Sequence, residues 1–149
     1  MSKRKRKPAF VFPELSGAAE GRPQHCPRCG GEGMGWHRAQ TREVVDPKLS
    51  QVEVVQYQCG SCGASLTVRP AGLGAKCRHS ARTKAISVVL WGLGLSLENV
   101  SRVMKGMGLP ISDVGVLKNV RAMGAQAMAR QKKARQRLKS PVLGADETQ

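Results

Sequence analysis

The sequence predicts two small units in series, a zinc ribbon of about three antiparallel strands and an all-α helix-turn-helix region, with basic flexible termini. Three observations predict this fold class. Cysteines fall in two CxxC pairs, short runs with strand character lie between and after the pairs, and the next segment has helical apolar spacing with serine caps. A chain of 149 residues is long enough for one modest domain or two very small ones.

Charge and composition limit the possible partners. The chain has 25 Lys and Arg against 10 Asp and Glu, a formal net charge of +15, which favours a polyanion and nucleic acid before membrane. Two Phe, two Trp and one Tyr are too few for an RNA-recognition platform of stacked bases. No apolar run approaches a membrane span or a secretory signal, so we expect an intracellular protein whose cysteines are reduced or bound to metal.

The first segment, residues 1–24, predicts a disordered basic arm. It begins with the run KRKRK at residues 3–7 and continues with scattered proline and glycine. The sequence leaves two roles open for this arm: contact with phosphate groups, or a solvated tail without a partner.

Residues 25–70 predict the zinc ribbon. Cys26 and Cys29 form one CxxC pair, Cys59 and Cys62 form the other, and a glycine follows each pair. Each pair places two sulfurs on one tight turn, and the glycine permits the left-handed conformation that turns backbone N–H groups toward the thiolates. Four soft ligands at tetrahedral angles suit structural Zn²⁺, and such a closed site leaves no place for a catalytic water. The remaining thiol and the imidazoles are expected not to be ligands: Cys77, His25, His37 and His79.

Strands are expected at residues 38–45, 51–58 and 66–68, with a turn at 46–50. In the second run the alternation of apolar and polar residues changes phase at Val55 and Tyr57, which indicates a β-bulge there. So small a sheet has little core, so we expect the metal to supply its stability.

Residues 80–124 predict the helix-turn-helix region, with Ser80, Ser96 and Ser112 as the caps of three helices. Gly92 and Gly94 end the first helix, and a glycine-rich stretch before Pro110 ends the second. The expected apolar faces are Ala85, Ile86, Val89 and Leu90 in the first helix, Leu97, Val100, Val103, Met104 and Met107 in the second, and Val114, Leu117 and Val120 in the third.

The third helix is expected to read DNA. Lys and Arg donate to guanine or phosphate, and Asn pairs with adenine. The expected outward residues are Gly115, Lys118, Asn119, Arg121 and Ala122, with Ser112 at the cap as a further contact. A structural helical hairpin is the alternative.

Residues 125–139 predict a basic helix or linker in which Arg130, Lys132 and Lys133 contact phosphate or form a solvated face.

The order of these segments resembles a known family. A CxxCG ribbon, the stretch GLSLENVSRVMKGMGLPIS, a basic linker and the strand-like VLGADETQ at residues 142–149 resemble the N-terminal part of bacterial insertion-sequence transposases of the DDE type, over about residues 25–149. The resemblance implies binding to double-stranded DNA at terminal inverted repeats, a bacterial cytoplasmic, nucleoid-associated location, and a homo-oligomer or a full-length transposase as partner. It also implies an RNase H-like domain in which three carboxylates hold Mg²⁺. Asp146 matches the first carboxylate, on the first strand of that domain at residues 140–149.

Only three residues follow Asp146 in the sequence, and Glu147, as its neighbour on a strand, points to the opposite face. We therefore expect a truncated, catalytically incomplete transposase that binds DNA, has no strand-transfer activity alone, and leaves residues 140–149 without sheet partners. Mg²⁺ is expected only in a full-length family member. The alternative from another class is an autonomous zinc-ribbon/helix-turn-helix transcriptional regulator, or an inhibitor that occupies the same DNA ends. An RNA- or ribosome-associated ribbon is a third possibility, which the shortage of aromatic residues disfavours.

Overall fold

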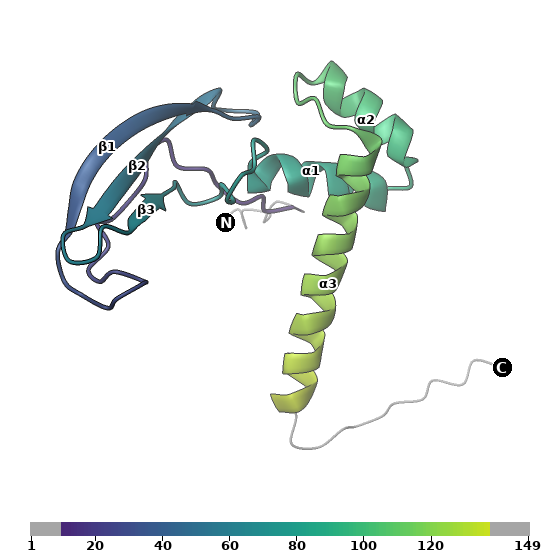
Figure 1. The fold of residues 1–149 in the computed structure, drawn as a ribbon. Coiled ribbons are helices and arrows are strands. Elements are labelled where there is room, and N and C mark those ends of the chain that lie inside the picture. Colours follow the sequence, from purple (N-terminus) through teal and green to yellow (C-terminus); the bar gives the residue numbers. More distant parts are fainter. Residues whose placement is uncertain (1–9, 138–149) are drawn as a thin grey trace, which may run out of the picture.

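The computed structural model describes residues 10–137 and consists of a three-stranded antiparallel sheet followed by three helices (Figure 1). The strands are β1 (Met34–Glu43), β2 (Gln51–Cys59) and β3 (Ser65–Val68). The helices are α1 (Ala81–Gly92), α2 (Leu97–Gly106) and α3 (Asp113–Arg137). This confirms the predicted order of strands and helices. The expected third helix and most of the expected basic helix form one continuous element, α3.

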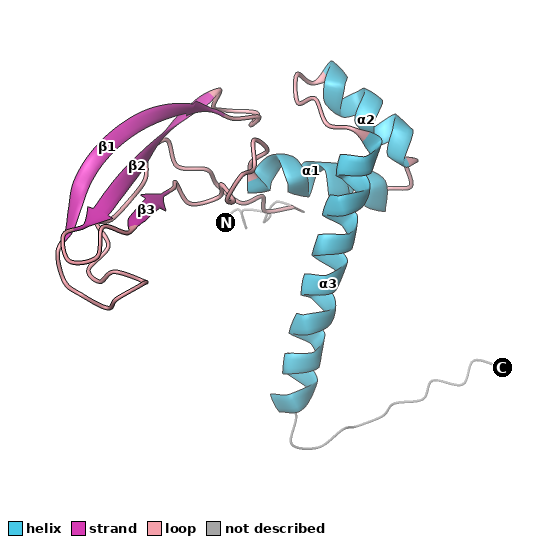
Figure 2. Ribbon diagram, in the orientation of Figure 1, coloured by secondary structure: helices cyan, strands magenta, loops and turns pink. Residues whose placement is uncertain are grey.

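Figure 2 shows the sheet at one end of the molecule and the helices at the other, with the second half of α3 projecting away from α1 and α2. No helix within residues 10–137 has both the length and the apolar character that crossing a membrane requires. The predicted strand at 140–149, and Asp146 with it, lies outside the described residues, as do residues 1–9 of the predicted arm.

In the sheet, β2 lies between β1 and β3. Val52 and Val54 are buried and alternate with exposed neighbours, whereas Val55 is buried on the opposite face, where it pairs with Val68 of β3. The predicted bulge in the second strand is wrong in its position. The register shifts in β1, between Trp36 and Arg38, so the additional residue is His37. The phase change in β2 arises instead because its two faces are covered by different clusters.

One face of the sheet is covered by the segment that precedes it. Leu15 is buried against Val52, Val54 and Leu73. Backbone hydrogen bonds hold this segment, because Glu53 N donates to Gly17 O at 2.9 Å and Ser16 N donates to Ala71 O at 3.3 Å. The prediction of a disordered arm therefore fails for residues 10–17. The physical reason is that the two valines of β2 need an apolar cover, and Leu15 supplies it.

The helices pack around a separate apolar cluster. Its buried members come from α2, the following turn and α3: Val100, Met104, Leu109, Ile111 and Val116. All three predicted caps are confirmed, since the hydroxyls of Ser80, Ser96 and Ser112 accept hydrogen bonds from the backbone N–H three residues later at 3.0, 3.3 and 3.1 Å.

The buried face of α3 agrees with the predicted one at Leu117 and Val120, which are half-buried, and differs from it at Val114. Val114 was expected in the core but is 55% exposed, whereas Val116 is fully buried and Val120, one turn further, packs against the same cluster. The turn between α2 and α3 fixes the rotation of α3, so residues 116 and 120 face α2. Val114 consequently lies on the outer surface.

The connection between β1 and β2 joins the sheet to the helices. Val45 N donates to Arg78 O at 2.8 Å, and Val45 packs against the helical cluster. The Asp46 carboxylate is fully buried, where it accepts from Ser80 Oγ at 2.6 Å and from Arg82 Nη1 at 3.3 Å. Because Ser80 caps α1, this buried pair fixes the start of the helical region onto the sheet.

Candidate metal centre and nucleic-acid interface

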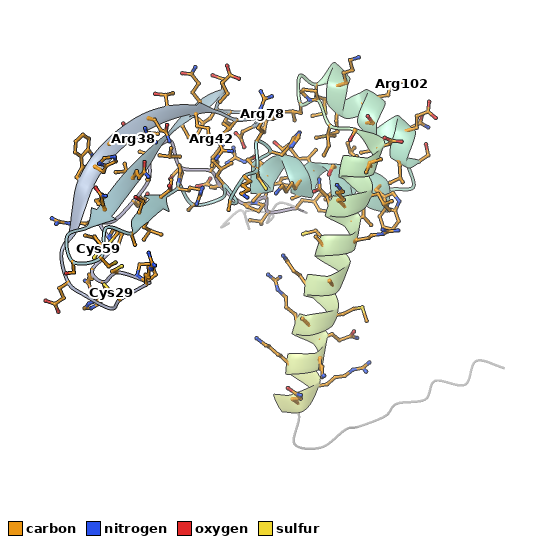
Figure 3. All side chains as sticks on the ribbon, in the orientation of Figure 1. Cys29, Arg38, Arg42, Cys59, Arg78 and Arg102 are labelled. Carbon is orange, nitrogen blue, oxygen red and sulfur yellow. The ribbon has the colours of Figure 1, made fainter. Side chains whose placement is uncertain are left out.

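The four cysteines of the two CxxC pairs lie together at the far end of the sheet. Their sulfur atoms all lie within 4.8 Å of one another. The Sγ–Sγ distance is 3.7 Å between Cys26 and Cys62 and 3.7 Å between Cys29 and Cys59. Figure 3 labels Cys29 and Cys59, which approach each other from the loop before β1 and from the end of β2.

The two turns that carry these sulfurs have matching backbone geometry. Cys26 N donates to Gly31 O and Cys59 N donates to Ala64 O, each at 2.9 Å. The glycines that follow the pairs, Gly30 and Gly63, have φ of +70° and +69°. The left-handed conformation predicted for both glycines is therefore confirmed, and each turn presents one buried and one exposed cysteine.

Backbone N–H groups favour the thiolate form of the first cysteine in each turn. The N–H groups of Cys62 and Ser61 lower the pKa of Cys59 to about 6. The N–H groups of Cys29 and Arg28 likewise lower the pKa of Cys26. For Cys29 the N–H of Gly31 acts in the same direction, but contacts with the other three thiols outweigh it and raise the pKa to about 12. The first cysteine of each turn is therefore the one favoured as a thiolate, whose negative charge a cation would neutralise.

The donor set and its dimensions fit a tetrahedral metal ion. A Zn–S bond of about 2.3 Å gives an edge of about 3.8 Å between sulfurs in a regular tetrahedron. The two short Sγ–Sγ distances of 3.7 Å are close to that value. The four thiolates can hold a metal ion, and Cys77, His25, His37 and His79 lie outside the group. His79 has another role, since its Nε2 lies 2.8 Å from Pro110 O in the α2–α3 turn.

The residues predicted to contact DNA differ in their exposure: most are exposed on α3, but one packs against α1. Ser112, Lys118 and Arg121 are exposed on the first part of α3, and Arg130, Lys132 and Lys133 are exposed on the projecting part. The outward placement of Asn119 is wrong. Its side-chain amide donates to Ser87 Oγ of α1 at 3.1 Å, because this face of α3 packs on α1.

Gly115 was also expected on the outer face, but it packs against the preceding turn. A Cβ atom at this position would lie 2.9 Å from Ile111 Cγ1, so the close approach requires glycine. The outer surface of the first turns is instead formed by Val114, Lys118 and Arg121, which are spaced to lie on one helical face. Sequence periodicity missed Val114 because valine at that spacing is usually buried.

The charge on α3 is not neutralised within the described chain. The helix has seven Lys or Arg and one acidic residue, Asp113 in its first turn. The three ion pairs among the side chains of residues 10–136 are Arg78–Glu43, Arg82–Asp46 and Arg102–Glu98, and none uses a basic residue of that part of α3. Such a helix attracts a polyanion.

Comparison with known proteins finds no match for this chain among protein-family models, curated proteins or solved structures.

Proposed function

We propose that this protein binds double-stranded DNA, with α2 and α3 as a helix-turn-helix and the sheet as a zinc ribbon. The observation that supports this most is α3. It combines an exposed first face next to the cap at Ser112 with a projecting basic half that no other described element covers. A helix inserted in the major groove needs both features, base contacts near its N-terminus and phosphate contacts along its length.

In this proposal, the first turns of α3 read base edges. Lys118 and Arg121 donate to guanine O6 and N7 or to phosphate. Val114, which is 55% exposed, can pack against the methyl group of a thymine in the major groove. Asn119 takes no part, since its amide is bound to Ser87.

The second half of α3 contacts the phosphate backbone. Residues 121–136 are exposed on all sides, and the helix extends about 25 Å beyond residue 120 at 1.5 Å per residue. An isolated helix of this length is marginally stable in water, so a partner that binds its basic side chains would also stabilise it. Arg130, Lys132 and Lys133 are the proposed phosphate contacts.

We assign Zn²⁺ to the four cysteines because a set of four thiolates in tetrahedral arrangement is the usual structural zinc site. Cys26, Cys29, Cys59 and Cys62 would hold the ion. The ion would have a structural role, since four protein ligands leave no open position for a water or a substrate.

The DNA that the resemblance implies is the terminal inverted repeat of an insertion sequence. We therefore propose that the chain includes the end-recognition part of a DDE transposase. Asp146, the carboxylate on which the catalytic part of the resemblance depends, lies outside the described residues. An autonomous regulator or transposition inhibitor would use the same DNA contacts.

A competition gel shift tests the proposal. Zinc-loaded protein is mixed with an inverted repeat from the flanking genome, and random duplex of equal length competes for binding, at about 150 mM salt. We expect at least about tenfold preference for the repeat. A preference for a promoter without an inverted repeat would favour the regulator. Absence of duplex binding would contradict DNA binding altogether.

A further inference from the structure

A groove of about 850 Å³ lies in the corner between α1, α3 and the segment that precedes the sheet. Figure 1 shows α3 crossing α1 and continuing past it, so α1 covers only the first part of α3. The walls are mostly apolar and include Phe10, Phe12, Val88, Val89 and Met123. Phe10 is 53% exposed and Met123 is 42% exposed. Residues 10–137 therefore leave an apolar surface in this corner open to solvent.

The wall formed by residues 10–13 is held in place by α1 and by the loop before it. The side chain of Arg82 is buried, and its Nε donates to Pro13 O at 3.1 Å. The next residue, Glu14, passes so close to Gly72 that a Cβ atom at Gly72 would overlap the Glu14 carbonyl oxygen. These contacts belong to the fold, so the groove is formed before a partner binds.

The groove uses a side of α3 that the proposed base contacts do not use. Ala122, Met123, Gln126 and Arg130 line it, at the spacing of residues that share one helical face. At 3.6 residues per turn, Met123 lies about 160° around the helix from Arg121. A partner in the groove would therefore leave the base-reading residues free. Arg130, one of the proposed phosphate contacts, stands at the groove and is shared by the two surfaces.

The charged side chains at the groove are basic. Lys84 of α1 and Arg130 of α3 line it, and none of the described residues that line it is acidic. Neither belongs to the three ion pairs among the side chains of residues 10–136. Apolar walls with basic side chains beside them are complementary to a partner that has both apolar side chains and carboxylates. The phosphate backbone of DNA supplies charge without apolar side chains.

We propose that the groove between α1 and α3 binds an amphipathic helix of a partner protein, with an apolar stripe flanked by Asp or Glu. In such docking, side chains at i, i+3 or i+4, and i+7 insert into the groove. They pack on Val88, Val89 and Met123, while the flanking carboxylates pair with Lys84 and Arg130. This docking goes beyond the proposed DNA binding and does not depend on it. With DNA on the outer face of α3, the groove would bring a second protein to the DNA.

A synthetic helix tests the proposal with the full zinc-loaded chain. The probe is a fluorescein-labelled peptide of about 16 residues, with leucine along one helical face and glutamate and alanine elsewhere. One comparison peptide has lysine in place of glutamate, and another has the same composition with the leucines spread around the helix. By fluorescence anisotropy, we expect the acidic amphipathic peptide to bind at least about tenfold more tightly than either.

Two methionines of α3 provide matched variants. Met123→Gln removes an apolar wall of the groove and is expected to weaken peptide binding about tenfold. Met128→Gln is the control, because Met128 is 73% exposed on the same helix and does not line the groove, and should change the affinity less than about twofold. Neither substitution alters the net charge, so both should keep duplex affinity in a gel shift within about twofold. Circular dichroism and zinc content establish that each variant folds.

Three results would overturn the proposal. Equal binding of the two acidic peptides would show that charge alone attracts them. Equal losses in Met123→Gln and Met128→Gln would place the contact outside the groove. A dimer of the unmodified chain in sedimentation that Met123→Gln dissociates would assign the groove to a second copy. Absence of duplex binding, with the acidic helix still bound in the groove, would instead contradict the proposed function and support the docking site.

Discussion

The two ends of the described chain are held together by different means. At the cysteine end of the sheet, the buried cluster consists of Cys26, Met34 and Cys59, so two of its three members are thiols. At the helical end, the buried cluster has five apolar members, and Val100, Met104 and Val116 are fully buried. Apolar burial is therefore a main support of the helices, whereas the cysteine end of the sheet depends on what its thiols bind.

This difference indicates that the two parts of the chain have separate roles. The part that carries the proposed DNA contacts has its own core, and the four cysteines that could hold a metal ion lie in a separate part, at the far end of the sheet. The two are connected by Val45, which packs with the helices, and by the buried Asp46–Arg82 pair. Variants at the metal centre, at this joint and on α3 therefore have distinct expected effects.

The largest expected effect is at the metal centre. Cys59→Ser removes a buried thiolate ligand, so we expect loss of the bound zinc and unfolding of the sheet, with α1, α2 and α3 largely retained. Zinc content by atomic spectroscopy and helicity by circular dichroism measure the two outcomes. Cys77→Ser is the matched control, because Cys77 lies outside the metal group and should leave the zinc content unchanged. Full zinc content in Cys59→Ser would contradict the four-cysteine site.

The next effect is at the joint. Asp46→Ala leaves the Arg82 guanidinium buried without its carboxylate, so we expect a loss of about 3 kcal/mol in the free energy of unfolding by urea. Glu43→Ala breaks the ion pair with Arg78, whose side chains are 75% and 65% exposed, and should cost less than about 1 kcal/mol. Equal effects of the two variants would show that the buried pair does not fix the sheet to the helices.

A smaller effect separates two neighbouring residues of α3. Asn119→Ala removes the hydrogen bond to Ser87, so we expect a loss of about 1 kcal/mol in unfolding free energy and little change in DNA affinity at a temperature where the variant is folded. Arg121→Ala should do the reverse, with unchanged stability and about tenfold weaker DNA binding. Chemical denaturation and a gel shift measure both. If Asn119→Ala alone weakened DNA binding, the corrected outer face of α3 would be wrong.

Local signals in the sequence predicted much of this arrangement. The two CxxC pairs determine their own geometry within a few residues, and the matching hydrogen bonds of the two turns follow from that spacing. The caps at Ser80, Ser96 and Ser112 were found for the same reason, since each satisfies a backbone N–H three residues away. Metal identity, DNA binding and the family resemblance stay predictions.

What the sequence could not predict depends on contacts between distant residues. Asp46 and Arg82 are 36 positions apart, and neither has a local pattern that indicates the other. The cover that Leu15 provides for β2 is equally distant in sequence, so residues 10–17 resembled a solvated tail. Val114 was misplaced on α3 because the preceding turn, which sets where the helix begins to pack, has no periodicity of its own.

The most direct test of the central claim, that the basic half of α3 binds DNA phosphates, is the salt dependence of duplex affinity. With about six phosphate contacts, we predict that affinity falls about 10³-fold between about 50 and 200 mM salt. Lys132→Gln combined with Lys133→Gln should reduce the slope of log affinity against log salt by about 2. A flat salt response of the unmodified chain, or the same slope in the double variant, would contradict the claim.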